Sequence, residues 1–345
     1  MHQIQNLKVN KLPNSEVEIL GSVLPEELKS YRVKAIKYFS ENMKLDGFRQ
    51  GKIPESIVIS KIGEVAILEE SAELFFREII PKLFVEEKIN SLGRPELIIT
   101  KLVPENPVEF KIKIAVLPEF TLPDYKKISE KIVSKKVPTP EVTEKEIEET
   151  IKNIRISRSG KKDVKDEKEM RDEDLPVFDD AFVKSLGDFK DTNDFKEKIK
   201  ENLLEEKKHR EMEKKRIEIS DVLVKESEIE LPEILVENEL EKMWSQFEYN
   251  ILRMGIKIED YVKHTGKDKE TLKKEWRADA EKNAKLELIL FKIAEKEKII
   301  PDEKAVSDEL IHVLEHYKEA DPERARAYIE RTHTNQAVFA FLEKP

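Results

Sequence analysis

One short stretch places an aromatic ring and two cations between glycines: Gly47-Phe48-Arg49-Gln50-Gly51-Lys52-Ile53-Pro54. Glycine adopts backbone angles that other residues resist, so the two glycines favour a tight loop. Such a loop would present Phe48, Arg49 and Lys52 together, which suits contact with an anionic surface. An ordinary helix–helix turn with solvated charges is the alternative interpretation.

Positive charge is concentrated around this loop, although the whole chain has a net charge of −10. Between residues 29 and 52 there are two anions, Glu41 and Asp46, against seven cations. The cations are Lys29, Arg32, Lys34, Lys37, Lys44, Arg49 and Lys52. A positive patch on an acidic protein predicts a local contact with nucleic acid or with an acidic protein surface. The acidic remainder argues against wrapping duplex DNA, so we expect the contact to be small and peripheral.

Two predicted helices position the loop. Pro25 opens the first, whose apolar residues recur at steps of three and four and are Leu28, Tyr31, Ala35, Phe39 and Met43. The second covers Glu55–Ile62 and is stopped by Gly63, and Pro54 fits its first turn, where a missing N–H costs nothing. Apolar stripes of this kind are typical of a core face rather than of a ligand site.

The surrounding sequence predicts one α+β domain over residues 1–117, a sheet covered by helices. Strands are expected near 7–12 and 17–23, and strict alternation over Val108–Val116 indicates a half-buried strand. A long helix should run from Glu64 toward Asn90, with a kink or break at Pro81. Gly93 and Pro95 are expected to end this part.

The remainder of the chain is predicted to be helical, with two links. Residues 118–159 should be an extended, proline-containing connector followed by a helix over Glu141–Arg158. Only Val164 and Met170 are apolar within 160–174, so this short charged link cannot bury a core. Residues 175–345 should form a C-terminal all-α domain. It would have a long helix from about Asp194 and four or five more helices after Pro232.

Composition excludes several classes of protein. The chain has no cysteine, so it can hold neither a disulfide framework nor a thiolate zinc site. The first residues lack the pattern of a signal peptide, and no apolar run reaches the roughly 18 residues of a membrane span. We therefore expect a soluble, cytosolic protein without membrane contact.

Several motifs resemble catalytic sites only superficially. The loop at 47–53 is one residue short of a phosphate-binding loop and has Ile53 where a magnesium-binding Ser or Thr should stand, so nucleotide hydrolysis is rejected. His312-Val313-Leu314-Glu315-His316 matches an inverted zinc-protease pattern but has no compelling third ligand, so an exposed helix face is favoured. Trp244, Phe247, Trp276 and Phe291 stand at helical spacing and are expected to pack.

The loop and the helix before it resemble the ribosome-docking motif of the bacterial trigger factor family. Support continues through most of the chain, in Glu87-Lys88-Ile89-Asn90, the strand at Val108–Pro118, Leu175-Pro176 with Asp180-Ala181-Phe182-Val183, and Glu228-Ile229-Glu230-Leu231-Pro232. The resemblance implies an α+β N-terminal ribosome-binding domain. It also implies an elongated all-α C-terminal chaperone body with two helical arms.

Residues 160–174 depart from the family pattern. The family carries a peptidyl-prolyl isomerase domain of FKBP type at this place, where the present chain has fifteen mostly charged residues. No aromatic-lined proline pocket can be built from them. We therefore expect no isomerase activity and no catalytic residue.

The resemblance implies an ATP-independent, ribosome-associated chaperone that uses no cofactor and no metal. Its partners would be ribosomal protein and RNA at the tunnel exit, together with nascent and unfolded polypeptides. The polypeptides would lie in a cradle formed by the C-terminal helices and the inner face of the first domain. The ribosome-binding residues it implies are Gly47, Phe48, Arg49, Gly51, Lys52 and, as an auxiliary cation, Lys44. A weak homodimer, a prolyl isomerase and a helical scaffold for one folded partner stay open as alternatives.

Overall fold

The structure is a computed structural model that describes residues 4–135, 140–159 and 175–344. The chain forms two compact units, and each unit combines two separate stretches of sequence. The first comprises Met1–Leu122 and Ser227–Ile289, and the second comprises Pro123–Glu226 and Leu290–Pro345. The charged link predicted at 160–174 lies outside the described residues.

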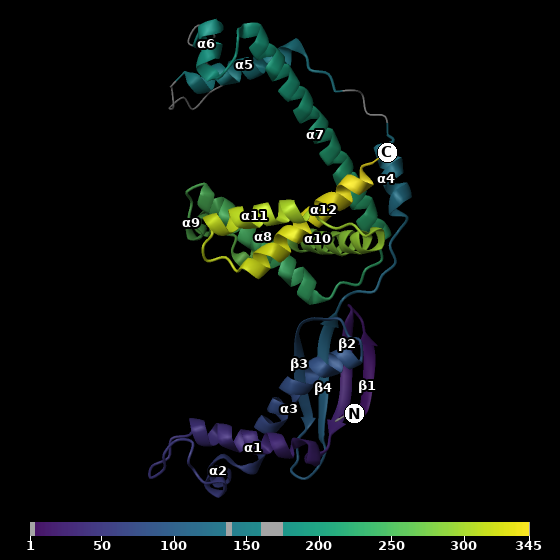
Figure 1. The fold of residues 1–345 in the computed structure, drawn as a ribbon, viewed down its shortest axis with the longest axis vertical. Coiled ribbons are helices and arrows are strands. Elements are labelled where there is room, and N and C mark those ends of the chain that lie inside the picture. Colours follow the sequence, from purple (N-terminus) through teal and green to yellow (C-terminus); the bar gives the residue numbers. More distant parts are fainter. Residues whose placement is uncertain (1–3, 136–139, 160–174, 345) are drawn as a thin grey trace. The chain divides into compact units, whose positions relative to one another are not determined.

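A four-stranded antiparallel sheet forms the centre of the first unit (Figure 1). Its strands are β1 (Gln5–Leu12), β2 (Glu16–Val23), β3 (Ser91–Lys101) and β4 (Val108–Val116), in the order β1-β2-β4-β3. The alternation in β4 is confirmed, because its alternate residues are buried against the helices while Lys111 and Lys113 bind Glu18 and Glu16 on neighbouring β2.

Strand β3 was not predicted from the sequence. Gly93 and Pro95 indicated an end to regular structure, because both residues weaken a strand. In the structure β3 is an edge strand, and its pairing with β4 shifts register between Leu92 and Glu96. Gly93, with a φ of +73°, and Pro95 therefore lie within an irregularity where the regular hydrogen-bond ladder is already interrupted.

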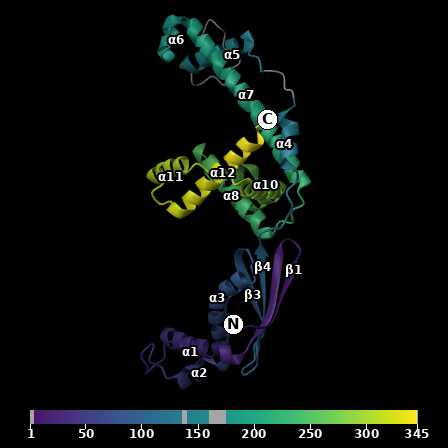
Figure 2. The ribbon, with the colours of Figure 1, turned by 45° about the vertical axis from the view of Figure 1, so that its right-hand side comes forward.

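Three helices complete the N-terminal part of the first unit: α1 (Pro25–Asn42), α2 (Glu55–Ile62) and α3 (Glu64–Glu86). α3 crosses one face of the sheet (Figures 1 and 2), where the Phe76 ring meets that of Phe110 on β4 with 4.6 Å between centroids. Pro81 does not break α3, contrary to one expectation from the sequence. Buried Ile80 and Phe84 on either side of it hold the helix to the core, and this packing outweighs the proline penalty.

α8 (Glu233–Arg253), α9 (Ile258–Thr265) and most of α10 (Lys269–Glu297) complete the first unit. The expectation that aromatic residues pack here is confirmed for Trp244, Phe247 and Trp276. The Phe247 ring lies 5.8 Å from Trp244 and 5.3 Å from Trp276, centroid to centroid. Phe291, included in the same expectation, is exposed instead.

The regular elements of the second unit are all helices, within the residues that the structure describes. Besides the end of α10, it contains α4 (Tyr125–Val133), α5 (Glu144–Arg158), α6 (Asp180–Leu186), α7 (Thr192–Glu226), α11 (Glu303–His316) and α12 (Pro322–Leu342). Five helices, α8–α12, follow Pro232, as predicted. The predicted fold class, an α+β N-terminal part followed by an all-α remainder, is confirmed for the described residues.

The extended connector predicted after residue 118 is wrong where α4 forms. Tyr125, Ile128 and Ile132 recur at helical spacing and are buried, and the Asp124 carboxylate accepts a hydrogen bond from the Lys127 N–H at the start of the helix. Pro118 and Pro123 stand before the helix and do not interrupt it. Proline density therefore obscured a short amphipathic pattern.

Membrane-spanning helices and metal-binding clusters were sought in the part of the chain that the structure describes. None of its helices combines the length and the apolar character needed to cross a bilayer. No group of three or more histidine, aspartate or glutamate side chains there is placed to hold a metal ion. His312 and His316 lie on an exposed face of α11 with ring centroids 4.4 Å apart, and the His316 Nδ1 is 2.9 Å from the His312 carbonyl oxygen.

Candidate functional site

The loop that joins α1 to α2 extends beyond the ends of both helices (Figures 1 and 2). Its backbone bonds to itself: the Phe48 N–H donates to the Leu45 carbonyl at 3.1 Å, and the Lys52 N–H donates to the Arg49 carbonyl at 3.0 Å. Gly47 has a φ of +86° and Gly51 a φ of +77°, angles that side chains rarely tolerate. The tight turn expected from these glycines is therefore confirmed.

The last turns of α1 anchor the far side of the loop. The Gly51 N–H donates to the Ser40 carbonyl at 2.8 Å, and the Ile53 N–H donates to the Ser40 hydroxyl at 3.3 Å. Ile53 is buried in a small apolar cluster with Ala35, Ile36, Val58 and Ile67. The loop thus projects from a packed base rather than hanging freely.

Ser40 was not singled out from the sequence, and Ile53 was noted only because it does not fit a phosphate-binding loop, not as an anchor of this loop. A usable signal existed, because Ser40 falls one turn after Ile36 on the apolar face of α1, where a buried hydroxyl needs a partner. Pro54 also lies one position earlier than expected. It is the N-cap of α2, and its carbonyl accepts bonds from the Ile57 and Val58 N–H groups, so its own missing N–H still costs nothing.

Three cations at the tip form no ion pair with any residue that the structure describes: Lys44, Arg49 and Lys52. All three are exposed. Further back on α1, by contrast, the Arg32 guanidinium lies 3.0 Å from Glu64 and the Lys37 ammonium 3.8 Å from Glu41. Lys29 and Lys34 on α1 also form no ion pair with a described residue, so three of the five unpaired cations between residues 29 and 52 stand on the loop.

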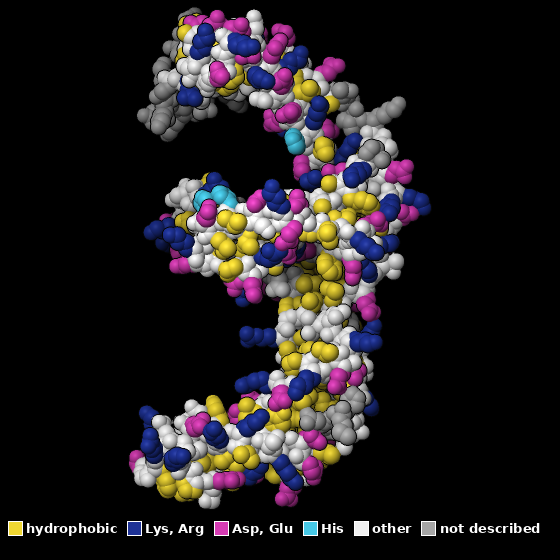
Figure 3. Space-filling model, in the orientation of Figure 1, with side chains coloured by type: hydrophobic (Ala, Val, Ile, Leu, Met, Phe, Trp, Pro, Cys, Tyr) yellow, Lys and Arg dark blue, Asp and Glu magenta, His cyan; other side chains and the backbone are white. Residues whose placement is uncertain are grey.

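The Phe48 side chain adds apolar surface to this charge, because 40% of it is exposed. Figure 3 shows lysine and arginine side chains beside hydrophobic ones over the end of the first unit that carries α1 and α2. The predicted site residues are thus brought together on one short loop. Their arrangement suits binding of an anionic surface with an apolar notch, and it contains no acid–base pair for catalysis.

Two family models match the chain. The model for the N-terminal part of the bacterial trigger factor protein matches residues 5–154, and the model for its C-terminus matches residues 192–344. The chain belongs to the bacterial trigger factor family. The resemblance drawn from the loop is thereby confirmed.

Curated trigger factors match at low identity over nearly their whole length. The trigger factor of Halothermothrix orenii is 25% identical, and the match covers 94% of this chain and 93% of the relative. That of Finegoldia magna is 24% identical, with 83% and 82% covered. A solved trigger factor chaperone, described for promiscuous substrate recognition in folding and assembly, shares the fold. Its TM-score is 0.57 at 17% identity, and the match covers 97% of this chain and 99% of that one.

The segment between the two family matches is short. Only residues 155–191 separate them. The alignment with the Halothermothrix orenii protein spans 406 positions but includes 94% of the 345 residues here, so about 80 of its positions face no residue of this chain. Taken together, these positions amount to the size of a small domain.

Proposed function

We propose that this chain is an ATP-independent chaperone of the trigger factor family that docks on the ribosome through its α1–α2 loop. The proposal depends chiefly on one observation: three unpaired cations and a half-exposed phenylalanine are held on a rigid, projecting loop. Arg49, Lys52 and the auxiliary Lys44 would meet RNA phosphate and acidic side chains at the tunnel exit. Phe48 would fill an apolar notch between them.

The strength expected of such a contact suits reversible docking. If about three cations meet phosphates, the logarithm of affinity should fall with that of salt at a slope of roughly −2 to −3. A micromolar site corresponds to only about 8 kcal/mol of binding free energy. Docking would still keep the chaperone at high local concentration beside an emerging polypeptide, so weak contacts with that polypeptide would suffice.

Scattered apolar side chains on the helices support a role in holding unfolded polypeptides. Large hydrophobic residues that are exposed on α8, α10, α11 and α12, or next to these helices, include Leu252, Met254, Phe291, Ile300, Ile311, Tyr317 and Tyr328. Charged residues surround them in the sequence, which suits loose contact with many segments rather than one deep pocket. Release would need folding of the client and dissociation, without a nucleotide.

Catalysis of prolyl isomerisation is not part of the function proposed for this chain. Residues 155–191 leave too little chain for an isomerase domain, so we propose that the protein lacks prolyl isomerase activity. It would act in the cytoplasm, where ribosomes and their products are. A weak homodimer stays a prediction.

Ribosome co-sedimentation tests the docking proposal. Changing Phe48, Arg49 and Lys52 together to alanine should abolish co-sedimentation and leave suppression of client aggregation unchanged. A matched control changes Lys29, Val33 and Lys37 on α1 to alanine, which removes the same kinds of side chain outside the loop. Undiminished co-sedimentation of the loop variant would remove the docking claim. Suppression of aggregation that is limited to one partner protein would favour the alternative of a helical scaffold.

A further inference from the structure

A groove of about 850 Å³ lies between the C-terminal half of α3 and the beginning of β3. Its floor is formed by Phe76, Ile80 and Phe84, which are four residues apart and therefore line one side of the helix. This row is about 12 Å long at 1.5 Å per residue. An extended peptide of roughly four residues would match that length.

The rim of the groove is apolar in part and exposed. Val85 is 79% exposed, and Pro81 stands beside it on the same helix. Pro81 has no N–H, so it donates nothing to the Arg77 carbonyl one turn earlier.

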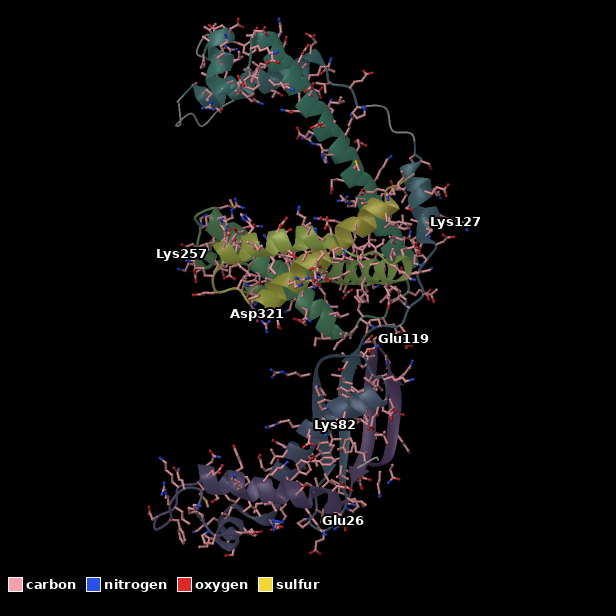
Figure 4. All side chains as sticks on the ribbon, in the orientation of Figure 1. Glu26, Lys82, Glu119, Lys127, Lys257 and Asp321 are labelled. Carbon is pink, nitrogen blue, oxygen red and sulfur yellow. The ribbon has the colours of Figure 1, made fainter. Side chains whose placement is uncertain are left out.

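The charges that line the groove are positive. Arg77 and Lys88 both contribute to its walls, and no aspartate or glutamate does. Neither cation forms an ion pair with a described residue. Lys82, labelled in Figure 4 on the same helix, is instead paired with Glu78 at 2.9 Å and does not line the groove.

Lys88 occupies a strained backbone position at the end of α3. Its φ is +54°, in the region that favours glycine. The Lys88 N–H donates to the Val85 carbonyl and the Ile89 N–H to the Phe84 carbonyl, the pattern of a helix ending that usually has glycine here. Lys298 ends α10 with the same hydrogen-bond pattern and a φ of +56°, so the strain alone assigns no binding role; what Lys88 adds to the groove is a cation.

We propose that this groove binds extended apolar segments of unfolded polypeptides that carry aspartate or glutamate beside the apolar residues. Pro81 and Val85, which are exposed at the rim, would take the apolar side chains over the buried floor, and Arg77 and Lys88 would meet the carboxylates. The inference rests on the proposed chaperone function and assigns it one client chemistry. Because the whole chain has a net charge of −10, it repels acidic peptides in general. A preference for them therefore requires a local cationic site.

Two synthetic peptides test the groove. Their binding to the full chain is measured by fluorescence anisotropy at low salt. Each has a central Leu-Phe-Val-Leu; one is flanked by two aspartates at each end and its twin by two lysines. The wild type should bind the aspartate peptide about three- to tenfold more tightly, as two partly screened charge contacts allow. The Arg77→Glu, Lys88→Glu variant should reverse that preference.

Val85→Gln tests the apolar contact separately and removes no charge. It should weaken binding of both peptides about threefold or more. Val65→Gln is the matched control, because Val65 is also exposed on α3 but does not line the groove. Circular dichroism and thermal unfolding verify that each variant is folded.

Several outcomes would overturn the inference. Equal binding of the two peptides, or an unchanged preference in the charge-reversed variant, would remove the cationic site. A dimer that Val85→Gln dissociates, with no peptide binding, would make the groove a contact between copies of the chain. If the wild type suppresses aggregation but binds neither peptide, the groove is not a client site and the chaperone function is unaffected. If it binds the peptides as expected but does not suppress aggregation, the groove is a peptide site and the proposed chaperone function is wrong.

Discussion

Ser40 and Ile53 are joined by two hydrogen bonds across the base of the loop. The Ile53 N–H donates to the Ser40 hydroxyl oxygen at 3.3 Å, and that hydroxyl donates to the Ile53 carbonyl at 3.5 Å. Both residues are buried, so the bonds connect the end of α1 to the start of α2 away from water. The two ends of the exposed tip are thereby tied together.

Ser40→Ala should weaken ribosome binding although every proposed contact residue remains. The substitution leaves the buried Ile53 N–H without its partner, at a cost of about 1–3 kcal/mol. Hydrogen exchange of amides 44–53 should accelerate, and ribosome affinity should fall. Ser30→Ala, at an exposed position on the same helix, is the control. Unchanged exchange and affinity would mean that the loop is not organised by this pair.

Single substitutions should separate the charged contacts from the aromatic one. Arg49→Ala and Lys52→Ala should each reduce the slope of log affinity against log salt by about one. Phe48→Ala should weaken binding without changing that slope, because an apolar contact releases no counterions. Co-sedimentation across a series of salt concentrations measures both quantities. A slope that none of the variants changes would indicate that these cations do not touch phosphate.

The sequence predicted elements whose local pattern agrees with their tertiary role. Strand β4 and helix α2 begin and end at the predicted residues, since alternation and the stop at Gly63 coincide with burial. β3 and α4 were missed because Gly93, Pro95 and the prolines before Tyr125 suggested loops, while packing and an edge position tolerate them. The loop residues could be predicted from the sequence because they form one contiguous motif. The groove between α3 and β3 could not, because only the folded backbone brings its residues together.

Lys88→Gly should stabilise the first unit while it removes a cation from the groove. Glycine adopts the observed φ of +54° without the strain of a side chain, which should raise the free energy of unfolding by about 1 kcal/mol. Lys82→Gly is the control. It places glycine inside α3 and should lower the free energy of unfolding by about 1 kcal/mol. Local hydrogen exchange of α3 compares the two. A destabilised Lys88→Gly variant would show that the lysine side chain supports the fold.

Acid should loosen the contact between α5 and α7. The Lys207 ammonium, the Thr143 N–H and the Thr143 hydroxyl all bond the Glu146 carboxylate, and they lower its pKa from 4.5 to about 2. A carboxylate whose pKa is lower in the folded than in the unfolded state stabilises the fold at pH values above its unfolded-state pKa. This stabilisation should therefore be lost as the pH falls from about 4.5 through about 2.

Glu146→Gln isolates this effect from the other carboxylates. At neutral pH the variant should show less protection of α5 amides from hydrogen exchange than the wild type, once intrinsic rates are corrected. The difference should shrink between about pH 4.5 and pH 2, where the wild-type carboxylate takes up its proton. Glu148→Gln, an exposed neighbour on the same helix, is the control. A difference that stays constant with pH would place the effect in packing rather than in the charge.

Refolding limited by proline isomerisation should not be accelerated by this protein. Cis–trans exchange of an X–Pro bond is slow, and its catalysis needs a shaped apolar pocket around the proline. The segment between the two family matches, residues 155–191, is shorter than an ordinary domain. With a substoichiometric amount of protein, the slow phase of a proline-limited client should keep its rate. An excess of protein should raise the yield of soluble client through holding alone. A slow phase whose rate rises in proportion to catalytic amounts of the protein would establish an isomerase site elsewhere in the chain.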